Sequence, residues 1–193
     1  MANAKISLMD YLREFKQSPR SIGSFAESGA QLSTAMAKAA HVKPGEIVVE
    51  FGPGTGVITA QLLAQGVLPS QLLLIEFNAK FATNLRIRFP HLNILQGDAW
   101  QIEKIMAEHF PGQTCSVIVS SLPLLNFPKA LRAALMAAVD RVLDPVHGRF
   151  VQFSYGLKSP IELGIGFSAA CSKWIVRNVP PARVWLYKRN VAT

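Results

Sequence analysis

Apolar runs and helical stretches alternate along most of this 193-residue chain. The short apolar runs are typical of strands that are buried on both faces, and the stretches between them repeat their apolar positions with helical spacing. We predict strands at 46–51, 71–77, 92–96, 115–121 and 149–155, and helices at 56–65, 78–89, 100–109 and 128–143. This alternation predicts an α/β fold in which right-handed crossover helices connect a mostly parallel sheet.

Two further patterns flank this core. Residues 5–16 place Leu8, Tyr11, Leu12 and Phe15 on one stripe of an amphipathic helix, and a second helix is expected at 30–40. Near the C-terminus, residues 173–177 and 183–188 predict a two-stranded antiparallel ribbon. We therefore expect a seven-stranded sheet closed by an antiparallel hairpin and preceded by N-terminal helices.

The first strong chemical signal follows the first predicted strand. An apolar run around Glu50 leads into three alternating glycines, Gly52, Gly54 and Gly56, which is typical of a turn where a ligand touches backbone. Glu76 closes the next apolar run, 20 residues past Gly56 (76 − 56 = 20). A carboxylate at this distance binds ribose hydroxyls in nucleotide-binding doubly wound folds, whereas a glycine turn that only reverses the chain does not require it.

Charge indicates which nucleotide this site binds. A dinucleotide site needs a third glycine where this chain has Val57, and Glu50 would repel a pyrophosphate. A ligand with a sulfonium, an ammonium and a ribose suits the two carboxylates, and S-adenosylmethionine has all three. The segment 50–56 with Glu76 accordingly resembles the glycine motif and the following acidic motif of class I methyltransferases.

Two later stretches extend the site. Asp98 follows the third strand, where it can accept the adenine amino group or simply cap the next helix. Residues 120–125, Ser-Ser-Leu-Pro-Leu-Leu, end the fourth strand and resemble the Asn-Leu-Pro-Tyr motif of amino-group methyltransferases. Ser121 replaces the Asn of that motif and Leu124 replaces the Tyr, so the aromatic ring that would stack on a flat base is missing.

The longer segments 119–128 and 150–156, together with the amphipathic N-terminus, are similar to bacterial phospholipid N-methyltransferases, relatives of the rRNA adenine dimethylases. The resemblance implies stepwise methylation of phosphatidylethanolamine towards phosphatidylcholine, with release of S-adenosylhomocysteine. It implies amphipathic and lid helices in residues 1–44 and a methyltransferase domain in 45–193. We expect catalytic roles for Ser121 and Tyr155, and substrate contacts from Tyr11, Leu122, Pro123 and Leu124. The expected cofactor residues are Glu50, Gly52, Gly54, Gly56, Glu76, Phe77, Asp98, Ala99 and Ser120.

Composition favours an anionic partner. The formal net charge is +8 and the sequence pI is about 9.8, which suits a nucleic acid or an acidic membrane surface. No apolar run reaches the roughly 18 residues of a membrane span, and the N-terminus lacks the apolar segment of a secretory signal. We expect a monomer in the cytoplasm that associates peripherally with the inner face of the membrane through residues 5–16. The four histidines and two cysteines show no metal-ligand spacing, and both cysteines are expected to be reduced and buried.

Two alternatives remain open at this point. An rRNA adenine dimethylase would share the glycine motif and the fourth-strand motif, and the basic C-terminal tail suits RNA. A protein that binds S-adenosylmethionine without transferring its methyl group would keep Glu50, Glu76 and Asp98 as well.

Overall fold

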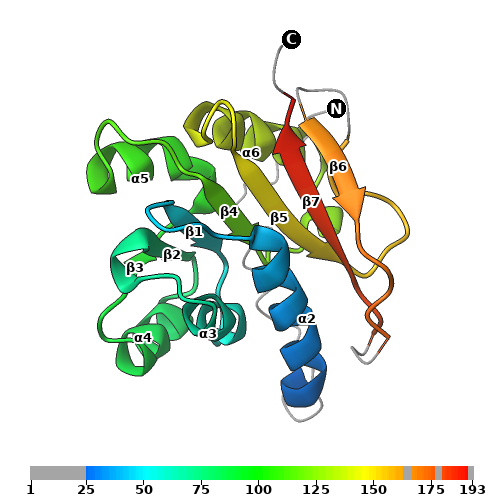
Figure 1. The fold of residues 1–193 in the computed structure, drawn as a ribbon, viewed down its shortest axis with the longest axis horizontal. Helices are drawn as coiled ribbons and strands as arrows, with labels where there is room; N and C mark the ends of the chain where they lie inside the picture. The colour runs from blue at the N-terminus through cyan, green and yellow to red at the C-terminus, as the bar shows by residue number, and fades with distance from the viewer. Residues whose placement is uncertain (1–24, 163–166, 177–179, 191–193) are drawn as a thin grey trace, which may run out of the picture.

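The computed structural model describes residues 25–162, 167–176 and 180–190. The predicted helix at 5–16, with Tyr11, lies outside the described residues. Within them, one seven-stranded sheet has the order β3-β2-β1-β4-β5-β7-β6 (Figure 1).

The strands and helices follow the predicted alternation, and their ends match the prediction or shift by up to five residues. The strands are β1 Val48–Phe51, β2 Leu72–Glu76, β3 Asn93–Gln96, β4 Val117–Ser120, β5 Arg149–Ser154, β6 Phe167–Cys171 and β7 Arg183–Arg189. The α-helices are α2 Phe25–Ala40, α3 Val57–Ala64, α4 Ala79–Arg88, α5 Ile102–His109 and α6 Lys129–Val142. Short 3-10 turns occupy η1 Pro69–Gln71, η2 Ala99–Gln101 and η3 Leu124–Asn126.

The sheet confirms the predicted fold class. Strands β1 to β5 pair in parallel, and β7 pairs antiparallel with β5 on one side and with β6 on the other. The strand order reverses between β1 and β4, and in open α/β sheets ligands bind beyond the carboxyl ends of the strands at such a point. We call the side of the molecule where the parallel strands end the carboxyl edge.

The predicted C-terminal ribbon is half right. The strand expected at 183–188 is β7, but its partner β6 precedes the expected segment 173–177. Within 173–176, only Ile175 pairs, through an isolated bridge to Ala182. The sequence of β6, Phe-Ser-Ala-Ala-Cys, consists mostly of small side chains with weak strand propensity. The segment Trp-Ile-Val at 174–176 has strong strand propensity, so the strand was predicted there instead.

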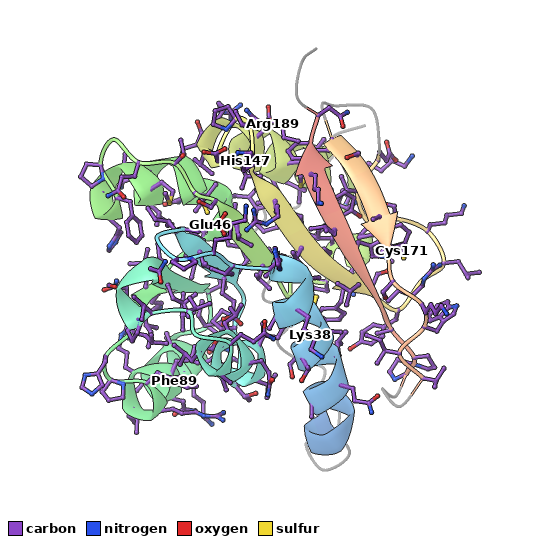
Figure 2. The ribbon with its side chains drawn as sticks, in the orientation of Figure 1. Lys38, Glu46, Phe89, His147, Cys171 and Arg189 are labelled. Carbon is purple, nitrogen blue, oxygen red and sulfur yellow. The ribbon has the colours of Figure 1, made fainter. Side chains whose placement is uncertain are left out.

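Apolar side chains cover both faces of the sheet, which explains why its strands are continuous apolar runs. In β1, Val49 and Phe51 face the core under α5 and α6, while Val48 faces the core under α2 and α3. Both cysteines are free, and Cys115 is buried as expected. Cys171 is only half-buried because it lies on β6, the last strand of the sheet (Figure 2).

Arg149 fixes the orientation of α2. This buried arginine begins β5, and its Nε donates to the carbonyl of Ala40, the last residue of α2 (3.0 Å). Its Nη2 also forms an ion pair with Glu46 Oε2 (2.5 Å), and Glu46 and His147 lie at this same end of the sheet in Figure 2. Because α2 ends where β5 begins, the helix runs antiparallel to β5 and starts towards the carboxyl edge.

Candidate functional site

The turn between β1 and α3 requires glycine. Gly56 has φ +79° and immediately precedes α3, and a Cβ atom placed there would lie 2.5 Å from a ring carbon of Phe89 and 2.9 Å from Leu85 Cδ2. Glycine at position 56 therefore lets the turn pack against the end of α4, and the start of α3 is a place where a ligand can meet backbone N–H groups.

Glu76, at the end of β2, stabilises this turn through hydrogen bonds. Its Oε2 accepts a hydrogen bond from Gly54 N (3.0 Å), and its Oε1 accepts one from Asn78 N (2.7 Å). Each carboxylate oxygen can accept a second bond, so the side chain can hold the turn and still accept a ribose hydroxyl. The ribose contact, and with it a contact from Phe77, stays a prediction.

Glu50 lies beneath the turn and is fully buried. Its Oε2 accepts from the hydroxyl of Thr59 on α3 (2.7 Å), and no described residue donates to its Oε1. Burial raises the pKa of Glu50 to about 8, and the nearby Glu76 carboxylate adds to the shift. A fully buried carboxyl oxygen without a partner suits a cationic ligand, which would pair with the ionised group.

Asp98 does cap the next element, as the alternative interpretation required. Its Oδ1 accepts from Trp100 N (3.0 Å) at the start of η2, and partial burial raises the pKa of its carboxyl. No described residue donates to the other oxygen, Oδ2, so the cap leaves an acceptor for an adenine amino group. Ala99 is buried directly behind it.

The loop after β4 is held by several polar contacts. Ser120 is buried and its Oγ accepts from Leu122 N (3.3 Å), while Ser121 N donates to the carbonyl of Phe51 (2.9 Å). Leu124 is only 2% exposed and packs into the core, whereas Leu125 is 43% exposed. Leu125, and not Leu124, is therefore the apolar side chain that this pair presents at the surface.

Gln152, on β5, is a site residue that the sequence interpretation missed. It pairs in register with Ser120, and its Nε2 donates to the carbonyls of Leu122 (2.9 Å) and Phe153 (2.8 Å). These two acceptors fix the orientation of the amide, and its buried Oε1 has no partner among the described residues. The sequence did contain a signal for this role, because Gln152 is a polar residue inside the apolar run 150–153.

Tyr155 follows β5 at the same carboxyl edge. Its ring meets that of Phe153 edge to face, with centroids 5.4 Å apart, and its side chain is 44% exposed. The structure thus brings the glycine turn, Glu76, Asp98, the loop after β4 and Tyr155 to one edge of the sheet, at the ends of successive strands.

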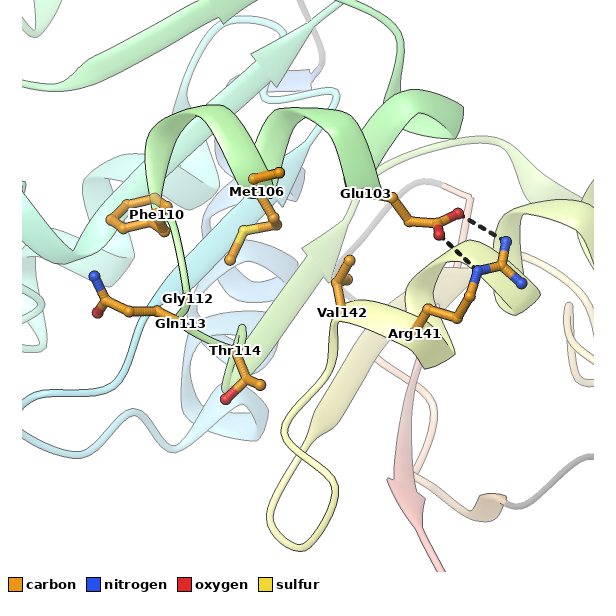
Figure 3. A pocket seen from close by; sticks show the side chains of 9 residues that line it. Glu103, Met106, Phe110, Gly112, Gln113, Thr114, Arg141 and Val142 are labelled. Carbon is orange, nitrogen blue, oxygen red and sulfur yellow. Dashed lines mark hydrogen bonds and ion pairs between the residues drawn. The ribbon is translucent and has the colours of Figure 1, made fainter.

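A pocket among the described residues lies away from this edge. A cavity of about 270 Å³ between α5 and α6 is lined by Met106, Phe110 and Val142, beside the ion pair of Arg141 Nε with Glu103 Oε2 at 2.7 Å (Figure 3). It adjoins the loop that enters β4, at the end opposite the glycine turn. Among residues 25–162, 167–176 and 180–190, no cluster of His, Cys, Asp or Glu is suited to hold a metal ion.

No protein-family model matches the chain. It is 32% identical over 148 residues to the ornithine lipid N-methyltransferase of Singulisphaera acidiphila, a match that covers 75% of this chain and 76% of that protein. It is 28% identical over 125 residues to the ribosomal RNA small subunit methyltransferase A of Prochlorococcus marinus, covering 63% of this chain but only 42% of that relative. The solved O-methyltransferase of Bacillus cereus in complex with S-adenosylhomocysteine shares the fold, with a TM-score of 0.65, 11% identity, and 94% and 90% of the two chains covered.

Proposed function

The chain belongs to the family of S-adenosylmethionine-dependent methyltransferases that includes ornithine lipid N-methyltransferase, and we propose that it methylates the amino group of a membrane lipid. Its cofactor is S-adenosylmethionine. Phosphatidylethanolamine is the acceptor we expect, with stepwise transfer towards phosphatidylcholine. The lipid named for the relative also presents an amine, so the shared chemistry of the acceptor is an aliphatic amine on a lipid.

The observation that carries this proposal is the set of hydrogen-bond acceptors where β4 and β5 end. The Leu122 carbonyl already accepts from Gln152 Nε2 (2.9 Å) and from Leu124 N (2.8 Å), whereas the buried Gln152 Oε1 beside it has no donor among the described residues. Neutral acceptors of this kind can receive the N–H groups of an amine without trapping it as an ammonium salt. The loop supplies no aromatic ring at Leu124, where a stacked base would need one.

Leu122 and Leu125 make the surroundings of these acceptors apolar, and we call this part of the site the acceptor mouth. Its apolar character affects the protonation state of the amine. An aliphatic ammonium has a pKa of about 10.4, so only roughly one amine in 2,500 is neutral and nucleophilic at pH 7. Apolar surroundings disfavour the charged form and shift this equilibrium towards the free amine. The chain's own contribution to catalysis is then mainly positioning.

Bound S-adenosylmethionine supplies an electrophilic methyl group and leaves as S-adenosylhomocysteine. The Ser121 hydroxyl and Gln152 Oε1 hold the N–H groups of the amine so that its lone pair points along the line of attack. As the C–N bond forms and the S–C bond breaks, positive charge moves to the lipid nitrogen. Tyr155 can hold that cation on its ring face, worth about 0.5–2 kcal/mol, before the nitrogen releases a proton to water.

The rRNA dimethylase alternative keeps one specific support, the similarity to ribosomal RNA methyltransferases. That similarity covers less than half of the relative's length, whereas the match to the lipid enzyme covers three quarters of both proteins. We therefore favour the lipid over RNA.

The test is transfer of a radiolabelled methyl group from S-adenosylmethionine to three acceptors offered in parallel: phosphatidylethanolamine vesicles, ornithine lipid vesicles and rRNA. Label in either lipid supports the proposal. Label in rRNA alone, or cofactor binding without transfer to any acceptor, refutes it.

The Gln152→Leu variant tests the role of this side chain in binding the acceptor. We expect it to lower turnover several-fold and to leave cofactor affinity unchanged. Gln113→Leu, at an exposed glutamine in the loop before β4, is the control and should leave both unchanged.

A further inference from the structure

Large apolar side chains are exposed at the carboxyl edge, where β5 ends and the β6–β7 hairpin turns. Leu157 is 74% exposed, Val176 70%, Tyr155 44%, Leu125 43% and Trp174 39%. We call these five residues the edge surface. Folding leaves part of their apolar area in water, and a cluster of such side chains is typical of a surface that meets a partner.

Strand register places these side chains at one level of the molecule. Ser154 pairs with Arg183, and the bridge between Ile175 and Ala182 continues the ladder one step further, beside Tyr155. The loop after β5 also meets the loop after β4, since a Cβ atom on Gly156 would lie 3.1 Å from Leu125 Cδ1. The edge surface therefore adjoins the same Leu122–Leu125 loop that forms the mouth of the acceptor site.

The surroundings of the edge surface are cationic. Residues 145–193 contain one acidic residue, Glu162, and that carboxylate pairs with Lys129 Nζ (2.7 Å). Among the described lysines and arginines of this stretch, Lys158, Lys173 and Arg183 lie at the carboxyl edge, whereas Arg149, Lys188 and Arg189 lie at the opposite end, where β5 begins and β7 ends. Lys158 and Lys173 are exposed, and no described carboxylate pairs with either one.

Arg183 places a positive charge next to the aromatic rings of the surface. Its guanidinium lies 5.4 Å from the centroid of the Trp174 ring and 5.6 Å from that of Trp185. Tryptophan rings with adjacent arginines and lysines are typical of the water–lipid interface, where the rings sit at headgroup depth and the cations meet lipid phosphates.

We propose that the edge surface docks on a bilayer that contains anionic lipid. The inference rests on the proposed function, because docking here would turn the acceptor mouth towards the headgroup layer. The two most exposed side chains of the surface, Leu157 and Val176, are aliphatic; they can enter lipid and offer no face on which a base can stack, which favours a membrane over RNA. Helix α2 also starts towards this edge (Figure 1).

The experiment compares two variants of the full chain that change charge equally. Leu157→Asp with Lys173→Glu alters the edge surface. Ile87→Asp with Lys43→Glu is the control, since Ile87 is 75% exposed on α4 and Lys43 is exposed in the loop before β1, away from the carboxyl edge. Each is sedimented with vesicles of phosphatidylglycerol and phosphatidylcholine, and with vesicles of phosphatidylcholine alone.

We expect the edge variant to lose about tenfold or more of its partition onto anionic vesicles, because one inserted apolar group and one cation near the surface are both removed. The control should stay within about twofold of the unaltered chain. Equal sedimentation of the two variants overturns the proposal. So does a selective loss of self-association or of RNA binding in the edge variant with vesicle binding unchanged, since the surface would then serve a second copy or RNA.

A second readout separates this inference from the proposed function. With the amino lipid dispersed in detergent micelles, the edge variant should methylate at the unaltered rate, and with vesicles it should be slow. A chain that binds anionic vesicles through the edge surface but methylates no lipid refutes the proposed function and leaves the docking intact. A chain that methylates lipid while the edge variant binds vesicles normally refutes the docking alone.

Discussion

Glu50 should couple cofactor binding to the release of a proton, and Glu50→Gln tests this. The carboxyl is fully buried beneath the glycine turn, its Oε2 accepts from Thr59, and no described residue donates to Oε1. Burial raises its pKa to about 8, so at pH 7 most molecules of the free protein carry the proton on this side chain. A sulfonium or ammonium placed nearby favours the ionised form, so the proton must leave as the cofactor binds.

The raised pKa fixes the sign and the size of the effect. An exposed glutamate titrates near pH 4.3, so between about pH 4.3 and 8 the folded protein binds more protons than the unfolded chain and its stability falls as the pH rises. From pH 6 to pH 8 the loss is roughly 2 kcal/mol. If the cofactor binds only the ionised form, its affinity rises by about 50-fold over the same interval, because the two effects involve the same proton.

Isothermal titration calorimetry with S-adenosylmethionine provides the assay. At pH 7 the observed enthalpy should depend on the ionisation enthalpy of the buffer with a slope of about 0.9 proton released per ligand. The amino group of the ligand also titrates, near 7.7–8.0, and the Glu50→Gln variant measures that contribution alone. Glu108→Gln, at an exposed carboxylate on α5, serves as a control and should behave like the unaltered chain.

Glu50→Gln should remove the steep pH dependence of both affinity and stability, and should make the free protein more stable at pH 8. The affinity of the Glu108→Gln control should change with pH as steeply as that of the unaltered chain, whereas an equally steep change in Glu50→Gln would refute the reasoning. A buffer dependence that is the same with and without the Glu50 carboxyl would refute it too.

Three further predictions concern single residues. Glu76→Ala should weaken S-adenosylmethionine binding by about 1.5–3 kcal/mol by calorimetry, the loss expected for a charge-assisted hydrogen bond; unchanged affinity in a folded variant removes Glu76 from the site. Ser121→Ala should lower the turnover of radiolabelled methyl transfer while cofactor affinity holds; if turnover is unchanged, the hydroxyl is incidental and another acceptor, such as Gln152 Oε1, orients the amine. Gly56→Ala should lower the free energy of unfolding in urea by about 1–3 kcal/mol, because the new Cβ meets Phe89 at a positive φ; an unaltered urea midpoint contradicts that packing argument.

Much of the fold is predictable because each parallel strand is buried on both faces. The run Leu72–Glu76 has no exposed residue, so apolar composition alone identifies it. The hairpin was predicted less well because β6 lies last in the sheet, where Ser168 and Ala170 are exposed and no apolar run forms. Its position depends on pairing with β7, a contact across 14 or more residues that propensity does not encode.

The site divides in the same way. Glu50 and Glu76 can be recognised in the sequence because burying a carboxylate in an apolar strand costs free energy unless it has a partner. Both also lie close in sequence to the glycines of the turn. Thr59 and Gln152 do not stand out, because their importance comes from partners brought together by folding. Gln152 meets the Leu122 carbonyl across 30 residues of sequence, and only the pairing of β4 with β5 makes that contact.

The residues around the acceptor determine which group receives the proton of the methylated amine. Strands β4 and β5 and the loops that follow them, to residues 128 and 162, carry a single carboxylate, and Glu162 is already paired with Lys129. The histidines lie outside these segments, with His147 at the opposite end of β5, in the turn that enters the strand. If no other part of the chain brings a base to the amine, these two segments leave water as the group to which each methylated nitrogen releases its proton before the next transfer. A mouth opening at the headgroup layer meets that need, because water and lipid amine are both present there, whereas a mouth sealed in the acyl region would keep the product charged.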